Sequence, residues 1–133
     1  MEKIKRIIIF GDSGYIGGNL KNTLQEKYPD IETLGFSFPE VDLTNNNDAH
    51  LLEEYVIPGT IMVMCSGIKK QYGDSLEIFE KNLKMVINVC KNLLSDNVLR
   101  FVFVSSAEVY GEDLDDMFIR EETQVAPTSY YGM

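Results

Sequence analysis

The chain alternates between short continuous apolar runs and longer stretches in which apolar residues recur every three or four positions. Four runs are rich in β-branched or other apolar residues and are four to seven positions long: 4–10, 31–36, 61–65 and 101–104. Continuous rather than alternating apolar residues are typical of parallel strands covered on both faces. A shorter extended fragment is predicted at 41–43. The pattern therefore predicts a buried sheet of four longer strands and one short one.

Helical spacing occurs in three segments between these runs. Residues 14–27 carry Ile16, Leu20 and Leu24 four positions apart, and a second, shorter helix is predicted over 48–56. The longest helix is predicted over 74–94. Its apolar stripe is expected to comprise Leu76, Phe79, Leu83, Val86, Cys90 and Leu93.

Strands that alternate with helices indicate right-handed crossovers and a parallel sheet. The fold class predicted is α/β, a Rossmann-like doubly wound parallel sheet, apparently truncated after the fifth strand region. One domain, an NAD(P)-binding Rossmann domain, is expected over 1–133. The methionines at 62, 64 and 85 are expected in its core.

Composition narrows the classes of partner. The 133 residues are 44% apolar, enough for the core of one domain, and the net charge is −9. Nucleic acids and anionic membranes attract clustered Lys and Arg, so neither is expected as a partner. No apolar run has the length of a membrane span. Cys65 and Cys90 lack metal-ligand spacing and are expected to be buried reduced thiols, which favours a cytoplasmic protein without a metal site.

Three glycines at spacings of three, Gly11, Gly14 and Gly17, lie between the first predicted strand and the first predicted helix. In this context the first glycine allows a tight turn, the second lets the backbone approach a pyrophosphate, and the third lets helix and strand pack closely. The helix N-terminus adds partial positive charge. The turn predicts a dinucleotide site; a flavodoxin-like domain that binds a mononucleotide such as FMN remains an alternative.

The choice between NAD and NADP stays open. An acidic residue at the end of the second strand would bind a ribose diol, and a basic one would accept a 2′-phosphate. The corresponding segment 34–38, LGFSF, contains neither.

Several motifs together resemble a known family. They are the 11–17 glycine turn, VDLT at 41–44, CSG at 65–67, Asn82, SSAEVYG at 105–111, and Pro127 with Tyr131-Gly132. Their order and spacing resemble the extended short-chain dehydrogenase/reductases, the NAD(P)-dependent epimerase/dehydratase family, which acts largely on nucleotide sugars.

The resemblance implies roles for matching residues. Tyr131 would be the catalytic acid/base, and Ser106 would hydrogen-bond the same substrate oxygen. Asp42 would meet the adenine edge with Leu43 beside the ring, and Asn82 would mainly support the site. The residues implied to bind NAD or NADP are Gly11, Ser13, Gly14, Tyr15, Ile16, Gly17, Asp42, Leu43, Cys65, Ser66, Gly67 and Asn82.

Two of these roles have alternatives. Tyr130 competes with Tyr131, which is preferred because the family's tyrosine is commonly followed by glycine. Asp42 could instead cap the helix that begins near 45–48.

A phenol with a pKa of about 10 needs a nearby cation to act as a base at neutral pH. In the family a lysine four residues after the tyrosine supplies it, which here would be position 135, beyond Met133. The chain is therefore expected to be the front part of an enzyme that binds nucleotide without turnover, with an exposed sheet edge that favours a homodimer. The alternative is a naturally short, non-catalytic nucleotide-binding or interaction module.

Overall fold

The computed structural model describes residues 3–112 and 118–133. The chain divides into two compact units. The first comprises Met1–Gly67 and Leu83–Val104, and the second comprises Ile68–Asn82 and Ser105–Met133.

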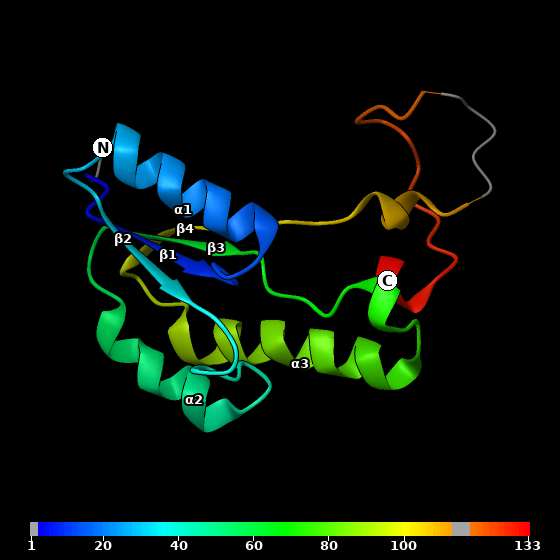
Figure 1. Cartoon of the computed structure of the whole chain (residues 1–133), viewed down its shortest axis with the longest axis horizontal. Helices are drawn as coiled ribbons and strands as arrows, with labels where there is room; N and C mark the ends of the chain where they lie inside the picture. Colours follow the sequence, from blue (N-terminus) through cyan, green and yellow to red (C-terminus); the bar gives the residue numbers. More distant parts are fainter. Residues whose placement is uncertain (1–2, 113–117) are drawn as a thin grey trace. The chain divides into compact units, whose positions relative to one another are not determined.

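The first unit contains a parallel sheet with the strand order β2-β1-β3-β4. Its strands are β1 (Arg6–Phe10), β2 (Glu32–Phe36), β3 (Thr60–Met64) and β4 (Val98–Phe103). The helix α1 (Tyr15–Lys27) covers one face of the sheet, while α2 (Asn46–Leu51) and the later turns of α3 (Leu76–Leu93) lie on the other (Figure 1). This arrangement confirms the α/β, Rossmann-like doubly wound parallel sheet.

The prediction of a strand at 41–43 was wrong. This segment enters a turn, in which the Asn45 N–H donates to the Asp42 carbonyl at 2.8 Å. Its backbone is held by side chains instead of by a neighbouring strand. The Asp42 N–H donates to the Asp48 carboxylate, and the Asp42 carboxylate accepts from the Thr44 N–H. The sheet of the described residues has four strands, so β4 is the fourth strand and not the fifth.

Alternating residues of β1 and β3 form the core on both faces of the sheet. Ile7, Ile9 and Val63 form one cluster, against which Leu20 and Leu24 of α1 pack. The intervening residues point to the opposite face because successive side chains of a strand alternate. Those that are almost fully buried there are Ile8, Phe10, Met62 and Met64. Together with the buried Met85, they confirm the predicted burial of the three methionines.

The apolar stripes predicted for two helices need correction. Ile16, in the first turn of α1, is 55% exposed, unlike Leu20 and Leu24. Leu76 and Leu83 of α3 are also exposed. The side of α3 that is buried instead carries Met85, Asn88, Val89 and Leu93.

Asn88 explains why the apolar spacing of α3 predicted the wrong buried face. Its side-chain amide donates to the Leu43 carbonyl at 2.8 Å, and the residue is only 5% exposed. A polar residue thus occupies the centre of the buried face, because it satisfies a backbone carbonyl of the segment before α2.

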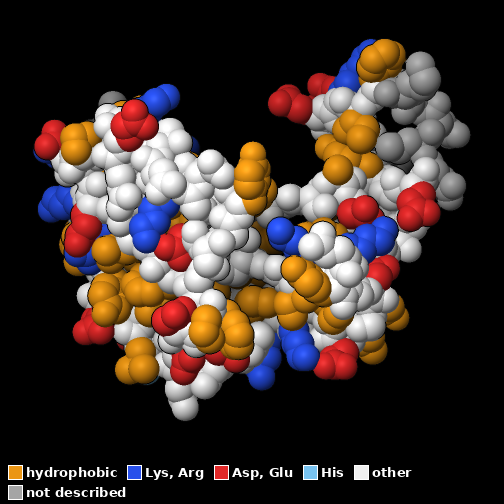
Figure 2. All heavy atoms as spheres, in the orientation of Figure 1, with side chains coloured by type: hydrophobic (Ala, Val, Ile, Leu, Met, Phe, Trp, Pro, Cys, Tyr) orange, Lys and Arg blue, Asp and Glu red, His pale blue; other side chains and the backbone are white. Residues whose placement is uncertain are grey.

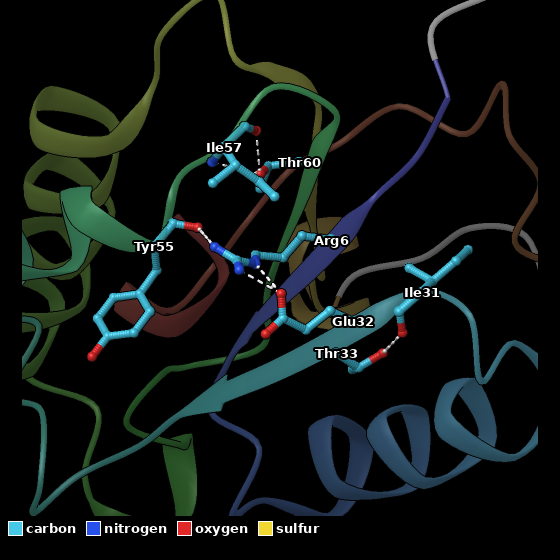
Figure 3. A network of polar contacts seen from close by, with 7 residues as sticks. All are labelled: Arg6, Ile31, Glu32, Thr33, Tyr55, Ile57 and Thr60. Atoms are coloured by element: carbon cyan, nitrogen blue, oxygen red, sulfur yellow. Dashed lines mark hydrogen bonds and ion pairs between the residues drawn. The ribbon is translucent and has the colours of Figure 1, made fainter.

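The edge of the sheet where the strands begin is held by Arg6 (Figure 3). Its guanidinium donates to the Glu32 carboxylate through Nε, at 2.7 Å, and through Nη2. It also donates to the Tyr55 carbonyl at 2.6 Å. Tyr55 ends the 3-10 helix η1 (Leu52–Tyr55), which continues α2. One side chain therefore links β1, β2 and the segment that leads into β3.

Within its described residues, 68–82, 105–112 and 118–133, the second unit contains three 3-10 helices and the first turns of α3. The 3-10 helices are η2 (Lys70–Tyr72), η3 (Ala107–Tyr110) and η4 (Tyr130–Gly132). In the part of the chain that the structure describes, no helix combines the length and apolar character needed to span a bilayer. On the face shown in Figure 2, basic and acidic side chains are interspersed.

Candidate functional site

The glycine turn follows β1 at the carboxyl edge of the sheet, where open α/β sheets bind their ligands. Gly11 has φ +90°, a conformation that favours glycine. A Cβ at Gly17 would overlap the carbonyl oxygen of Gly11 and lie 2.8 Å from its carbonyl carbon. The turn and the start of α1 can pack this closely only without a side chain at Gly17.

The middle of the turn is open to solvent. Ser13 and Gly14 are exposed, as are Tyr15 at 82% and Ile16 at 55%. Gly14 is the N-cap of α1 and makes no side-chain hydrogen bond, so the first N–H groups of the helix are not capped by it. An exposed, uncapped helix N-terminus of this kind suits a phosphate group.

The segment after β3 packs directly against the turn. The Cys65 N–H donates to the Phe10 carbonyl at 2.9 Å, which extends the pairing of β3 with β1. A Cβ at Gly11 would lie 2.9 Å from the Ser66 nitrogen and 3.0 Å from its Oγ. Burial raises the pKa of the Cys65 thiol, so this residue stays a neutral thiol. The structure thus brings Gly11, Cys65 and Ser66 together, with Gly67 next in the chain.

A cluster centred on Asp12 was not predicted. Asp12 Oδ1 accepts a hydrogen bond from Ser37 Oγ at 2.6 Å, and Oδ2 accepts one from Lys21 Nζ at 2.7 Å. Burial raises the pKa of Asp12, but the hydrogen bonds from Lys21 and Ser37 and the charge of Lys21 outweigh it and hold the pKa below its usual value. The signal in the sequence was an acid inside the glycine turn, together with Gly35 in the second strand.

Asp42 and Leu43 lie in the turn before α2. Asp42 Oδ1 accepts from the Thr44 N–H at 2.9 Å and from Thr44 Oγ1 at 2.7 Å. The alternative in which Asp42 caps the helix is wrong, because the N-cap of α2 is Asn45, whose side chain accepts from the Asn47 N–H. Leu43 is 5% exposed.

Asn82 of α3 supports the backbone that follows Gly67. Its Oδ1 accepts from the Ile68 N–H at 2.7 Å, and its Nδ2 donates to the Ile68 carbonyl at 3.1 Å. Both polar atoms of the amide are thereby engaged with one residue. This geometry suits support of a loop more than direct contact with a ligand.

In the second unit, Glu108 links the segment of Ser106 to that of Tyr131. Ser106 is the N-cap of η3, and its Oγ accepts from the Glu108 N–H at 3.2 Å. The Glu108 carboxylate accepts from Ser129 Oγ at 3.3 Å and from Lys70 Nζ at 2.7 Å. The Lys70 hydrogen bond is the main cause that lowers the pKa of Glu108.

Gly132 lies against the backbone of Glu108. A Cβ there would overlap the Glu108 carbonyl oxygen and lie 2.9 Å from its carbonyl carbon. The glycine after Tyr131 therefore lets η4 pack against η3. The Tyr131 N–H donates to Asp74 Oδ1 at 3.0 Å, whereas the ring of Tyr130 packs near Phe79, with centroids 6.2 Å apart.

The predicted site residues thus form two groups. Those of the glycine turn, the turn before α2 and the end of β3 lie in the first unit; Ser106, Tyr131 and Asn82 lie in the second. No hydrogen bond between the Ser106 and Tyr131 side chains occurs among the described residues. Within 3–112 and 118–133, no three His, Cys, Asp or Glu side chains gather as metal ligands would.

Known proteins resemble this chain along almost its whole length. A trifunctional UDP-glucose 4,6-dehydratase/UDP-4-keto-6-deoxy-D-glucose 3,5-epimerase/UDP-4-keto-L-rhamnose-reductase of Arabidopsis thaliana is 26% identical, over 98% of this chain and 23% of its own length. A UDP-glucose 4-epimerase of Klebsiella pneumoniae is also 26% identical, over 80% of this chain and 93% of the relative. The chain spans about a quarter of the length of the first of these relatives.

Solved structures show the same fold. The UDP-Glc/GlcNAc 4-epimerase of Campylobacter jejuni superposes with a TM-score of 0.80 at 23% identity, over 96% of this chain and 45% of the other. A dTDP-4-dehydrorhamnose reductase of Clostridium acetobutylicum gives 0.75 at 21% identity, over 96% and 45%.

The model of one family matches residues 7–133, from β1 through the glycine turn to the last residue of the chain. The chain therefore belongs to the NAD dependent epimerase/dehydratase family.

Proposed function

We propose that this chain binds NAD or NADP at the glycine turn and belongs to an enzyme that oxidises and reduces a nucleotide sugar. The observation that carries the proposal is the contact of Gly17 with the Gly11 carbonyl, which places the open N-terminus of α1 at the carboxyl edge of the sheet. Family membership implies an NAD(P) cofactor. The named relatives act on UDP-linked sugars, which suggests the substrate class.

The first unit supplies the residues that would hold the dinucleotide. The pyrophosphate would lie against the first N–H groups of α1, those of Tyr15 and Ile16, because the Ser13 N–H donates to Ser37 Oγ and the Gly14 N–H donates to the Gly11 carbonyl. Ile16 and Tyr15 are exposed apolar surfaces beside it. The adenosine would lie toward Asp42 and Leu43, and residues 65–67 would line another side of the cofactor site.

The second unit supplies the proposed acid and base. When bound, NAD or NADP would supply the acceptor and donor of a hydride. Tyr131 removes the proton from the substrate hydroxyl as a carbonyl forms, and returns it on reduction. Ser106 retains its O–H as a donor while its oxygen accepts the Glu108 N–H, and so it can hydrogen-bond the same substrate oxygen.

Nucleotide binding is the first prediction to test. Calorimetric titration of the purified 133-residue chain should show one site per chain for NAD or NADP, with a dissociation constant in the micromolar range. Titration with FMN should give no heat of binding, because a mononucleotide would leave the adenosine half of the site empty. Binding of FMN alone would contradict the proposal and support the mononucleotide alternative.

We also propose that the protein resides in the cytoplasm and self-associates along β4. This strand is at the end of the sheet order, and its residues Val102 and Phe103 are 40% and 53% exposed. Unpaired strand edges with apolar side chains favour pairing with another chain. Light scattering after size-exclusion chromatography should show a dimer whose fraction rises with concentration and falls for Val102→Lys. A monomer at every concentration would refute this.

A further inference from the structure

The carboxylate of Asp12 is held in one position by two neighbours. Ser37 donates to Oδ1 and Lys21 to Oδ2, at 2.6 and 2.7 Å. The side chain of Asp12 is 17% exposed, so part of it faces solvent. Asp12 belongs to the glycine turn, Lys21 to α1, and Ser37 directly follows β2.

Gly35 makes room for this carboxylate. A Cβ at Gly35 would overlap the carboxyl group of Asp12 and lie 2.6 Å from its Cβ. Gly35 is the fourth residue of β2, and it pairs with Ile9 of β1. Asp12 therefore lies over the carboxyl end of β2, although its position in the sequence is in the glycine turn. This is the place where a dinucleotide fold presents the acidic group that binds the ribose diol of NAD.

The hydrogen-bonding capacity of the cluster suits a diol better than a phosphate. The Ser37 hydroxyl donates its one hydrogen bond to Asp12, and its oxygen accepts a hydrogen bond from the Ser13 N–H at 2.9 Å. It can then only accept a further hydrogen bond, as can both oxygens of Asp12. A ribose 2′-hydroxyl can donate to such acceptors. A 2′-phosphate cannot, and its charge would be repelled by the carboxylate.

We infer that Asp12 supplies the acidic group that binds the adenosine ribose, with Ser37 and Lys21 as positioning residues, and that the site therefore prefers NAD to NADP. This inference rests on the proposed dinucleotide binding. It assigns to the glycine turn a role that the fold usually gives to the residue at the end of the second strand.

Lys21 is the one group of the cluster that favours a 2′-phosphate. Its ammonium is paired with Asp12, and its side chain is 29% exposed. Because the pair is neutral as a whole, Lys21 offers little net attraction while Asp12 is ionised. The lowered pKa of Asp12 keeps it ionised at neutral pH. Removal of the negative charge, however, should release Lys21 for a phosphate.

The experiment compares Asp12→Asn with the wild-type chain in calorimetric titrations with NAD and with NADP. The wild type should bind NAD at least tenfold more tightly. In Asp12→Asn, affinity for NAD should fall about tenfold, since a charge-assisted hydrogen bond is lost. Affinity for NADP should rise, so that the preference disappears or reverses. Asp30→Asn is the matched control, because Asp30 is an exposed acid of the turn before β2; it should keep the wild-type preference.

Two further variants keep the inference testable if Asp12→Asn folds poorly. Ser37→Ala removes the hydroxyl that orients the carboxylate and should reduce the preference for NAD severalfold. Lys21→Met should leave NAD preferred. If the wild type prefers NADP and Lys21→Met abolishes that preference, Lys21 binds the 2′-phosphate of NADP and the inference is wrong. Equal affinities that Asp12→Asn does not change would overturn it as well, while dinucleotide binding would stand. Absence of binding to either nucleotide would refute the proposed function and this inference together.

Discussion

Gly17→Ala should abolish measurable dinucleotide binding and destabilise the chain by about 2 kcal/mol, as expected for a side chain forced into a packed contact. The added methyl group would overlap the Gly11 carbonyl oxygen and lie 3.1 Å from Asp12 Cα. Relief of the overlap requires α1 to move away from the turn, which displaces the N–H groups proposed to bind the pyrophosphate. Urea unfolding and calorimetric titration measure the two effects.

Gly18→Ala is the matched control, because it makes the same substitution one position later in the same helix. A Cβ there lies 3.0 Å from the Asp12 carbonyl oxygen and meets no second atom at close range. Alanine also favours a helix over glycine by about 1 kcal/mol, which offsets this tight contact. We expect near-wild-type stability and binding. If both variants bind nucleotide equally well, the close approach of turn and helix is not needed for the site.

Tyr131→Phe should lower kcat by two to four orders of magnitude, the range typical of a lost general acid or base. Phenylalanine keeps the ring and the backbone N–H that donates to Asp74, and removes only the hydroxyl. The assay measures turnover of UDP-linked sugars, the proposed substrates, by the native protein. Affinity for the dinucleotide should stay unchanged, since the glycine turn is in the other unit.

Tyr130→Phe separates the two adjacent tyrosines. The ring of Tyr130 packs near Phe79, and the substitution preserves that contact. We expect full turnover for this variant. The opposite result, with Tyr130→Phe inactive and Tyr131→Phe active, would assign the proton transfer to Tyr130. A structural role alone would change stability in both variants without a selective loss of kcat.

The positions of strands and helices followed from the sequence because they depend on local pattern. The runs at 4–10, 31–36 and 61–65 are rich in apolar residues, and each contains a parallel strand; β1 and β3 are buried, whereas β2 is mostly half-buried. The turn at 41–43 was harder to recognise. Three extended-looking residues are too few to show whether a neighbouring strand or side chains such as Asp48 will satisfy their backbone groups.

The buried face of α3 depended on a partner far away in the chain. Asn88 is buried because its amide reaches the Leu43 carbonyl, 45 residues earlier. The spacing of apolar residues predicts which apolar side chains are buried. It does not predict the burial of a polar side chain whose hydrogen-bond partner is far away in the sequence. Leu83 was therefore assigned to the core in place of Asn88.

For the candidate site, the sequence alone determined the glycine turn, since strand, glycines and helix are adjacent in the chain and the steric need for glycine is local. The steric reasons proposed for Gly11 and Gly17 agree with the positive φ of one and the backbone contact of the other. Only the tertiary structure showed that Asp12, Lys21 and Ser37 form one cluster over Gly35. A pairing of β1 with β2 brings residues 25 positions apart within 2.6 Å, and such proximity depends on strand register, which a linear pattern does not contain.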